Sequence, residues 1–241
     1  MISVCMATYN GERFVEDQIH SILEQLTAED ELVISDDDST DRTREIIERI
    51  GDPRIRLISH RPCGVVYNFE NALKAARGDY VFLSDQDDIW YEGRIQAVVG
   101  RLAAGAMVVT VDARMIDAQG IVLKESFFAA NHSSAGFLKN LWKNSFLGCC
   151  MAFRRELLNY VLPFPSHLYM HDWWIGLVAS FLRFRCEFLP VPYHGYRKHG
   201  SNVTDSGNTS RNPYWLRIYN RLTLLLPLLV RWGRGRLRKK G

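Results

Sequence analysis

The chain has 241 residues, of which 47% are apolar and 24% are charged, the composition of an ordinary globular protein with ample core. Its length suits one large domain or a domain with a tail. The net charge of +3 arises from residues 231–241, which hold six basic and no acidic side chains and leave −3 on the rest, so the overall charge is no argument for nucleic-acid binding.

Apolar segments of two periodicities alternate along the first half of the chain. Short β-prone runs predict strands, and apolar residues at helical spacing predict helices between them. The predicted strands are 2–8, 31–35, 54–59, 79–84 and 107–112, and the predicted helices are 14–26, 42–50, 65–77 and 92–103. This alternation predicts an α/β fold with a mostly parallel central sheet and helices on both faces.

The pattern is looser after residue 112. Residues 113–140 predict a long excursion, with a short helix near 136–143. Residues 144–157 predict a buried strand that turns into a helix. An apolar helix over 171–182, a strand over 186–191 and a polar loop over 196–202 follow.

A tail begins near residue 214 and contains the apolar run LTLLLPLLV at 222–230, followed by the basic cluster. A run this short cannot span a bilayer, since a spanning helix needs roughly 20 residues. Adjoining apolar and basic segments favour an amphipathic anchor at an anionic membrane surface. The alternative is a helix that packs on the core and ends in a disordered basic segment.

The N-terminus MISVCMATYN has neither a basic region nor a long apolar stretch, so we expect no signal peptide. The five cysteines follow no disulfide or zinc spacing, which predicts buried thiols in a reducing compartment.

Polar clusters stand where three of the predicted strands end. They are Thr8-Tyr9-Asn10, Asp36-Asp37-Asp38 and Asp85-Gln86-Asp87. Ligands of open α/β sheets bind beyond the carboxyl ends of the strands, so we expect the three clusters to meet at one site.

The stretch FLSDQDDIW at 82–90 runs from an apolar strand into Asp85, Asp87 and Asp88. Carboxylates at a strand end can face a hard cation such as Mg²⁺ or Mn²⁺ and the phosphate that it carries. Most isolated Asp-x-Asp pairs lie in turns or helix caps. The strand before this pair and the polar ends of other strands favour the metal site.

The second cluster, SDDDSTD at 35–41, allows two functions. Ser39 or Asp41 suits the cap of the helix over 42–50. Capping does not require Asp36 and Asp37, and a carboxylate there can accept a hydrogen bond from a nucleotide base or ribose.

Six segments in chain order resemble family 2 glycosyltransferases of the GT-A fold. They are SVCMATYNGERFVEDQIHSIL, ELVISDDDSTDRT, ARGDYVFLSDQDDIW, LGCCMAFRREL, HDWWIGLVAS and YRKHGSN. The resemblance covers about residues 1–205 and is strongest to the bacterial branch that includes rhamnosyltransferases of surface-polysaccharide assembly. It implies a nucleotide-sugar donor.

The resemblance implies roles for residues of the first half. Thr8, Tyr9, Asn10 and Glu12 match the first nucleotide-contacting segment. Asp37, with Asp36, matches the base-contacting carboxylate, and Asn68 lies at a further nucleotide contact. DQDD matches the family's Asp-x-Asp element, in which Asp85 reaches ribose or metal and Asp87 is the main metal ligand.

In the second half, Asp172 matches the catalytic base, with His171 at the preceding position where the family often has glutamate. The alternative for Asp172 is an N-cap of a helix that begins at 173. His199 matches a segment that closes over the diphosphate and completes the metal site. Arg197 and Lys198 can neutralise phosphate charge, and Trp173 and Trp174 either stack on sugar rings or belong to the core.

These inferences predict a GT-A glycosyltransferase domain over 1–213, with a nucleotide-binding half (1–112) and an acceptor half (113–213), and a membrane-associating tail over 214–241.

The predicted activity is inverting, Mn²⁺- or Mg²⁺-dependent transfer of a sugar, with rhamnose the best candidate. The expected donor is a dTDP- or UDP-sugar, and the expected acceptor is a glycan or lipid-linked saccharide. We expect a cytoplasmic protein, peripheral on the inner face of the cell membrane, with no nucleic-acid partner. The alternative is a catalytically inactive sugar-nucleotide-binding scaffold.

Overall fold

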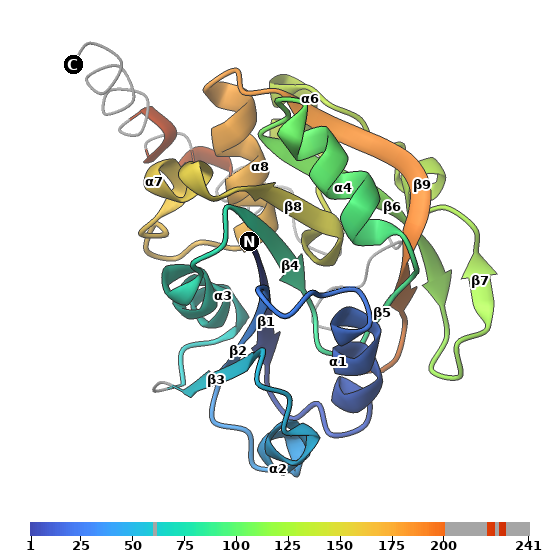
Figure 1. Cartoon of the computed structure of the whole chain (residues 1–241). Coiled ribbons are helices and arrows are strands. Elements are labelled where there is room, and N and C mark those ends of the chain that lie inside the picture. Colours follow the sequence, from blue (N-terminus) through green and yellow to red (C-terminus); the bar gives the residue numbers. More distant parts are fainter. Residues whose placement is uncertain (60–61, 201–220, 225–226, 230–241) are drawn as a thin grey trace.

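The computed structural model describes residues 1–59, 62–200, 221–224 and 227–229, and a central sheet surrounded by helices organises them (Figure 1). The strands are β1 (Ile2–Thr8), β2 (Glu31–Asp36), β3 (Ile55–Ser59), β4 (Tyr80–Ser84), β5 (Ile89–Trp90), β6 (Val108–Ile116), β7 (Val122–Lys124), β8 (Met151–Arg154) and β9 (Cys186–Arg197). The helices are α1 (Val15–Leu23), α2 (Thr43–Ile50), α3 (Val65–Ala75), α4 (Arg94–Ala103), α5 (Phe127–Asn131), α6 (Phe137–Trp142), α7 (Leu158–Val161) and α8 (His171–Phe181), with short 3₁₀ turns η1 (Gly148–Cys150) and η2 (Arg155–Leu157).

The strands lie in the order β3-β2-β1-β4-β8-β6-β9-β5, and β7 pairs with β6. The first four are parallel, as predicted, so their carboxyl ends share one edge. β8 is inserted antiparallel between β4 and β6. Among the described strands, four of the eight pairings are parallel and four antiparallel, so the whole sheet is mixed rather than mostly parallel.

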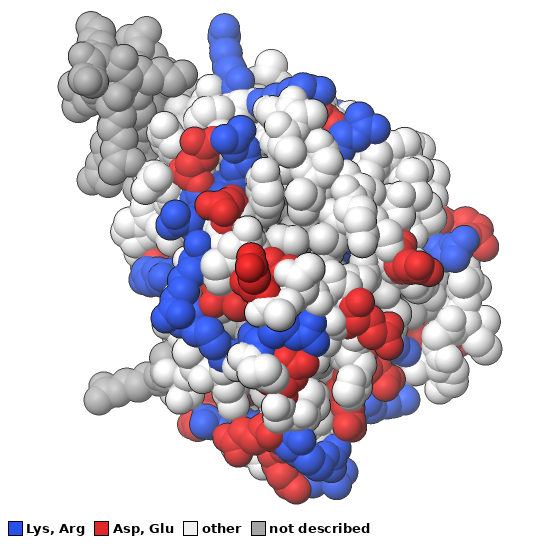
Figure 2. Space-filling model, viewed as in Figure 1, with Lys and Arg blue, Asp and Glu red and all other residues white. Residues whose placement is uncertain are grey.

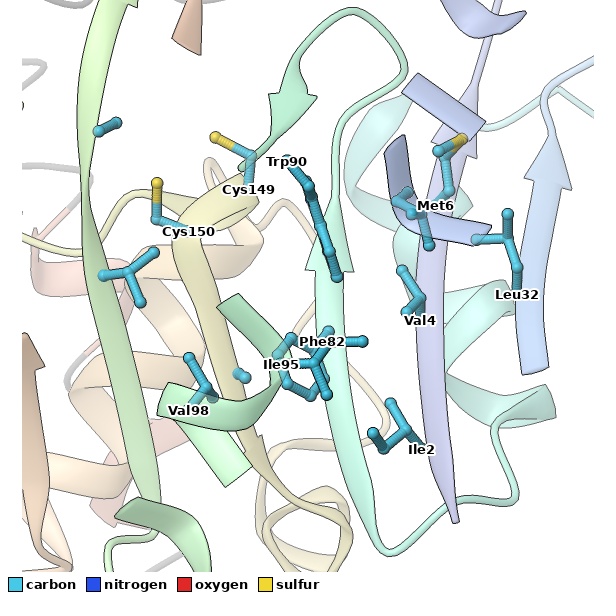
Figure 3. Close-up of a cluster of buried hydrophobic side chains, with 14 of the residues drawn as sticks. Ile2, Val4, Met6, Leu32, Phe82, Trp90, Ile95, Val98, Cys149 and Cys150 are labelled. Atoms are coloured by element: carbon cyan, nitrogen blue, oxygen red, sulfur yellow. The ribbon is translucent and has the colours of Figure 1, made fainter. Parts of the chain in front are cut away.

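Side chains of β1 alternate between the two faces of the sheet, and each face has its own core. Ile2, Val4 and Met6 join the core formed with α1, α2 and α4, together with Leu32 and Phe82 of the neighbouring strands (Figure 3). Cys5 and Ala7 join the other core, formed with α3 and α8. Both cores lie against the same buried strand, so its polar carboxyl end is held by packing from both sides.

Exposed ion pairs link α1 to α2, and the loop before α1 to the residue before α2. Arg49 lies 3.1 Å from Glu16, and Arg42 lies 3.3 Å from Glu12. Figure 2 shows acidic and basic side chains interspersed over this face of the molecule. Exposed pairs of this kind contribute about 0–1 kcal/mol each, so the two cores carry most of the stability.

The second half contains more strand than the sequence predicted. β6 continues to Ile116 rather than ending at 112, and β9 continues to Arg197 rather than ending at 191. The two strands pair in parallel as far as Ile116 and Arg197, and this pairing draws the start of the predicted polar loop into the sheet. β7 and α5 lie inside the predicted excursion.

Only seven residues of the proposed tail, 221–224 and 227–229, lie among the described residues. Leu224 and Leu228 are buried in the core formed with α3 and α8, whereas Leu222 and Leu229 are exposed. Nε of Arg221 donates to the carbonyl of Leu141 at 3.0 Å. These described residues therefore pack on the domain, and the remainder of 214–241 lies outside the described residues. None of the described helices is long and apolar enough to cross a membrane.

All five cysteines are free thiols. Cys5, Cys149 and Cys150 are buried and Cys186 is partly buried, as the apolar surroundings of these segments predict, but Cys63 is exposed in the loop before α3.

Candidate functional site

A cavity of about 960 Å³ lies at the carboxyl ends of β1, β2 and β4. It is lined by residues 7–11, 13–14, 37, 64–65, 68, 85–87, 170–171, 196 and 199–200. Each of the three polar clusters at the strand ends contributes to this wall, because parallel strands place their carboxyl ends at one edge.

The loop after β1 supplies Thr8, Tyr9 and Asn10 to the cavity. Asn10 has a left-handed backbone with φ of 47°, which asparagine tolerates better than most residues. Its Oδ1 accepts from the backbone N–H of Thr40 at 2.8 Å, so the loop is tied to the segment before α2. Glu12 does not line the cavity, because its carboxylate accepts from the backbone N–H and Nε of Arg42.

Asp36 and Asp37 have different surroundings. Asp36 is fully buried, and its carboxylate accepts from the hydroxyls of Thr8 and Ser39 at 2.8 and 2.6 Å. It fixes the turn after β2 and does not line the cavity. Asp37 does line it, and its carboxylate accepts from the backbone N–H groups of Cys63 and Gly64 at 2.8 and 2.9 Å.

Asn68 joins the same wall from α3. It is 1% exposed, and its Nδ2 donates to the carbonyl of Thr8 at 3.0 Å. The carbonyl of Thr8 also accepts from the backbone N–H of Asp37, so one backbone group at the end of β1 holds the side chain of Asn68 and the backbone of Asp37.

Gln86 connects the loops after β1 and β4, a role that sequence reasoning missed. Its Oε1 accepts from the backbone N–H of Tyr9 at 2.9 Å, and its Nε2 donates to the carbonyl of Tyr9 at 3.0 Å. Gly11 leaves room for this amide, because a Cβ at that position would overlap the Gln86 side chain. No local pattern distinguishes such a glutamine from a solvated one.

The loop that follows β4, residues 85–88, contains three carboxylates and is called the acidic loop below. Asp85 is the first of them. Burial, followed by the charges of Asp88, Asp87 and Asp172, raises its pKa well above the usual value. Asp85, Asp88 and Cys149 offer donor atoms within 4.8 Å of one another. Asp87 faces His199 instead, whose Nε2 lies 2.7 Å from Oδ2 of Asp87.

A buried network behind the acidic loop was also missed. Oδ2 of Asp88 lies 2.8 Å from Nε2 of His194, and Nδ1 of His194 lies 2.6 Å from Nη1 of Arg94. Since guanidinium can only donate, Nδ1 accepts and Nε2 carries the proton that it donates to Asp88. Arg94 is fully buried, with its Cζ 4.0 Å from the ring centroid of Trp90 and its Nη2 donating to the carbonyl of Cys149. This network holds the acidic loop against β9.

Arg197 and Lys198 do not line the cavity. Nε of Arg197 donates to the carbonyl of Asp87 at 2.8 Å, and its Nη1 donates to the carbonyl of Ala118 at 3.1 Å. The backbone N–H of Lys198 donates to the carbonyl of Ile116. Arg13 lines the cavity, with its guanidinium over the ring of Phe14.

Asp172 lies in the first turn of α8, which begins at His171, so the residue is inside the helix and not its N-cap. It is 3% exposed and does not line the cavity, although its neighbours in the chain, Met170 and His171, do. Burial raises the pKa of Asp172 to about 6, although the backbone N–H of Trp173 and Nδ2 of Asn144 donate to it. A carboxyl group with this pKa is ionised at neutral pH and suits a general base.

Trp173 and Trp174 both belong to the core. Their Nε1 atoms donate to the carbonyls of Asn140 and Val161, and neither residue lines the cavity. The structure therefore supports core packing, and not stacking on a sugar ring, for both tryptophans.

The acidic loop suits a hard divalent cation. Asp87 and His199 form a carboxylate–imidazole pair that Mg²⁺ or Mn²⁺ can accept as ligands, whereas the donor atom of Asp85 groups with those of Asp88 and Cys149. Burial, and after it the negative charge of neighbouring carboxylates, raises the pKa of Asp85, and a cation there would offset the repulsion among the carboxylates.

Comparison with known proteins identifies a sequence family. A family model described as glycosyl transferase family 2 matches residues 3–162. A dTDP-rhamnosyl transferase, RfbG, of Shigella flexneri is 39% identical over 102 residues, which are 39% of this chain and 35% of that protein. An Escherichia coli UDP-Glc:alpha-D-GlcNAc-diphosphoundecaprenol beta-1,3-glucosyltransferase, WfgD, is 33% identical over 103 residues, which are 42% of this chain and 41% of that protein. The matched segments thus span less than half of either relative.

Solved structures share the fold at lower identity. Staphylococcus aureus TarS 1–349 in complex with UDP-GlcNAc superposes with a TM-score of 0.72 at 21% identity, over 93% of this chain and 66% of that one. The mannosyltransferase PcManGT of Pyrobaculum calidifontis in complex with GDP-Man and Mn²⁺ superposes with a TM-score of 0.62 at 20% identity, over 97% of this chain and 64% of that one.

Proposed function

This chain belongs to glycosyl transferase family 2 and has the GT-A fold, and from that premise we propose that it transfers a sugar from a nucleotide-sugar donor in polysaccharide biosynthesis. The observation that carries the proposal is the cavity that joins the Thr8 loop, Asp37 and the acidic loop, with the buried Asp172 next in the chain to the lining residue His171. The donor's nucleotide occupies the part of the cavity lined by Thr8, Asp37 and Asn68, and its diphosphate extends toward Asp87.

The proposed reaction is an inverting displacement at the anomeric carbon. Asp172 takes the proton of an acceptor hydroxyl, the hydroxyl oxygen forms the new bond to the anomeric carbon, and the bond from that carbon to the diphosphate oxygen breaks. The nucleoside diphosphate leaves with the electron pair of that bond. Arg13, which lines the cavity, is the cation placed to offset the charge of the leaving group.

Asp85, Asp87 and His199 would hold a divalent cation, Mn²⁺ or Mg²⁺. When bound, such a cation stabilises a diphosphate as it becomes a leaving group. The oxygen-rich donor set and the crowded charge around Asp85 support this assignment, as does the Mn²⁺ in the complex of the Pyrobaculum mannosyltransferase.

The finer proposal is a dTDP- or UDP-sugar donor, with rhamnose the best candidate, and a glycan or lipid-linked acceptor. The similar Shigella protein is named a dTDP-rhamnosyl transferase, and the similar Escherichia coli protein is named for a UDP-glucose donor and a diphosphoundecaprenol-linked acceptor. We further propose that residues 1–112 bind the nucleotide and 113–213 the acceptor, and that 214–241 contacts the inner face of the cell membrane.

Calorimetric binding of dTDP, UDP and GDP, each with Mn²⁺ and with a chelator, tests the core of the proposal. We expect one nucleotide to bind with an affinity that the chelator reduces, and Asp87→Ala to abolish that metal dependence while the fold survives. Binding of none of the three by wild type would overturn the nucleotide site. Unchanged metal dependence in Asp87→Ala would overturn the metal assignment.

A binding scaffold without catalysis is the second candidate, because Asp172 is buried and does not line the cavity. Tight nucleotide binding without hydrolysis or transfer over a broad panel of donors and acceptors would favour it. Measurable turnover of any donor would exclude it.

The membrane contact has its own test. Replacing the six basic residues of 231–240 by serine leaves Leu224 and Leu228 in place, and we expect it to release the protein from vesicles of phosphatidylglycerol. Equal binding by the substituted protein would refute an electrostatic anchor.

A further inference from the structure

His171 is the lining residue whose polar atoms are left without partners. It is 5% exposed and forms part of the cavity wall. Within the described part of the chain, neither Nδ1 nor Nε2 has a hydrogen-bond partner. A buried polar group without a partner costs free energy, so a native fold that keeps two on one ring calls for a ligand that satisfies them.

The imidazole is held in a fixed orientation. It stacks on Phe69 of α3 with a centroid separation of 4.0 Å and an interplanar angle of 25°. Gly148 leaves the space beside Nε2 open, since a Cβ there would lie 3.0 Å from Nε2 and 3.3 Å from Cβ of Asp172. His171 is therefore oriented by packing alone, and its Nε2 lies beside Gly148 and the Cβ of the proposed base.

The charge state of the ring selects its partner. Burial lowers the pKa of His171 to about 3, so the imidazole is neutral near pH 7. A neutral imidazole has one N–H donor and one nitrogen acceptor. An ionised phosphate offers no donor and can pair only with the N–H nitrogen, whereas a sugar hydroxyl both donates and accepts and can pair with either nitrogen.

We propose that His171 recognises a sugar hydroxyl in the cavity through one of its ring nitrogens, as donor or as acceptor, and so selects the sugar that reaches Asp172. This inference rests on the proposed function. The hydroxyl belongs to the transferred sugar of the donor or to the acceptor saccharide, and the two sources are separable by experiment.

His171→Phe is the decisive variant, because it keeps a ring on Phe69 and removes both nitrogens. Calorimetry compares UDP and dTDP, which lack the transferred sugar, with UDP-glucose and dTDP-rhamnose. We expect the affinity for the nucleoside diphosphates to change by less than about twofold. If the transferred sugar is the source, the affinity for the nucleotide sugar that wild type binds falls at least about tenfold, equal to about 1.4 kcal/mol.

If the acceptor is the source, donor binding is unchanged, and the KM for a GlcNAc-diphospho-lipid acceptor rises at least about tenfold with little change in kcat. His20→Phe, on the exposed face of α1, is the matched control and should change none of these values. His171→Asn retains one polar position and serves if the phenylalanine variant does not fold; we expect it to show a smaller loss of the same kind.

Thermal unfolding separates recognition from a structural role. Without ligand, His171→Phe should unfold at the wild-type temperature or above it, because the substitution removes two unpaired polar atoms from a buried position. A lower unfolding temperature, with unchanged affinities for both nucleotide sugars and an unchanged acceptor KM, would overturn the proposal. Failure of wild type to bind UDP or dTDP would instead overturn the proposed function itself.

Discussion

Asp172 is the residue on which the proposed chemistry depends. Asp172→Asn keeps the size of the side chain and its contacts with α8 but removes the base, so we expect kcat to fall by about 10²–10⁴. The affinity for the nucleoside diphosphate should stay within about twofold of wild type, because Asp172 does not line the cavity. Transfer at the wild-type rate by this variant would return Asp172 to a structural role in the first turn of α8.

The raised pKa of Asp172 predicts the pH dependence of the reaction. The carboxyl group is protonated below its pKa of about 6 and ionised above it, and only the ionised form can accept a proton. We therefore expect kcat/KM to rise about tenfold per pH unit below pH 6 and to level off near pH 7. A rate that is flat between pH 5 and 7, at constant nucleotide binding, would contradict a base with this pKa.

At the scale of the element, α8 carries both His171 and Asp172, and its position depends on one glycine. Gly176 faces Phe146, and a Cβ at 176 would overlap the phenyl ring. Both residues are fully buried, so the ring has little room to move. We expect Gly176→Ala to lower the free energy of unfolding by about 1–3 kcal/mol through overpacking.

Gly100→Ala on α4 is the matched control, because a Cβ at 100 meets no atom within 4 Å. It should stabilise the protein by about 0.5–1 kcal/mol through helix propensity alone. Urea unfolding measures both variants. Equal effects of the two substitutions would show that α8 does not depend on its close contact with Phe146.

Element boundaries also show how much of the secondary structure can be predicted from local sequence. The predicted strands and helices between residues 2 and 103 occur with ends shifted by at most a few residues, because each contains enough apolar residues in one period. β5 and β7 were missed because two- and three-residue strands show no period of their own. They exist only because β9 and β6 lie beside them.

At the scale of the whole molecule, two leucines tie the tail to the domain. Leu228 is 1% exposed in the core formed with α3 and α8, and its neighbour Leu229 is 56% exposed. We expect Leu228→Ala to cost about 2–5 kcal/mol of unfolding free energy. Leu229→Ala should change it by less than about 0.5 kcal/mol. Urea unfolding with equal midpoints for the two variants would show that this segment does not pack on the domain.

Some residues of the candidate site could likewise be predicted from local sequence, whereas the position of others depends on contacts between distant segments. Thr8, Asp37 and Asp85 were predicted together because each ends a parallel strand, and such strands share an edge whatever the details of packing. Glu12 and Asp36 were placed in the site by the same segments, yet they bond to Arg42 and to Ser39 and Thr8. Which side of a loop faces the cavity depends on side-chain partners that periodicity does not reveal.

The sequence by itself determined the order and type of nine of the first ten elements, all but β5, the edge of the sheet that carries the polar clusters and the resemblance to the family. These features depend on residues close together in the chain. Only the tertiary structure decided the antiparallel insertion of β8, the Asp88–His194–Arg94 network and the stacking of His171 on Phe69. Each of these joins segments about 40 or more residues apart, and such contacts are chosen by which strands and helices become neighbours when the two cores form.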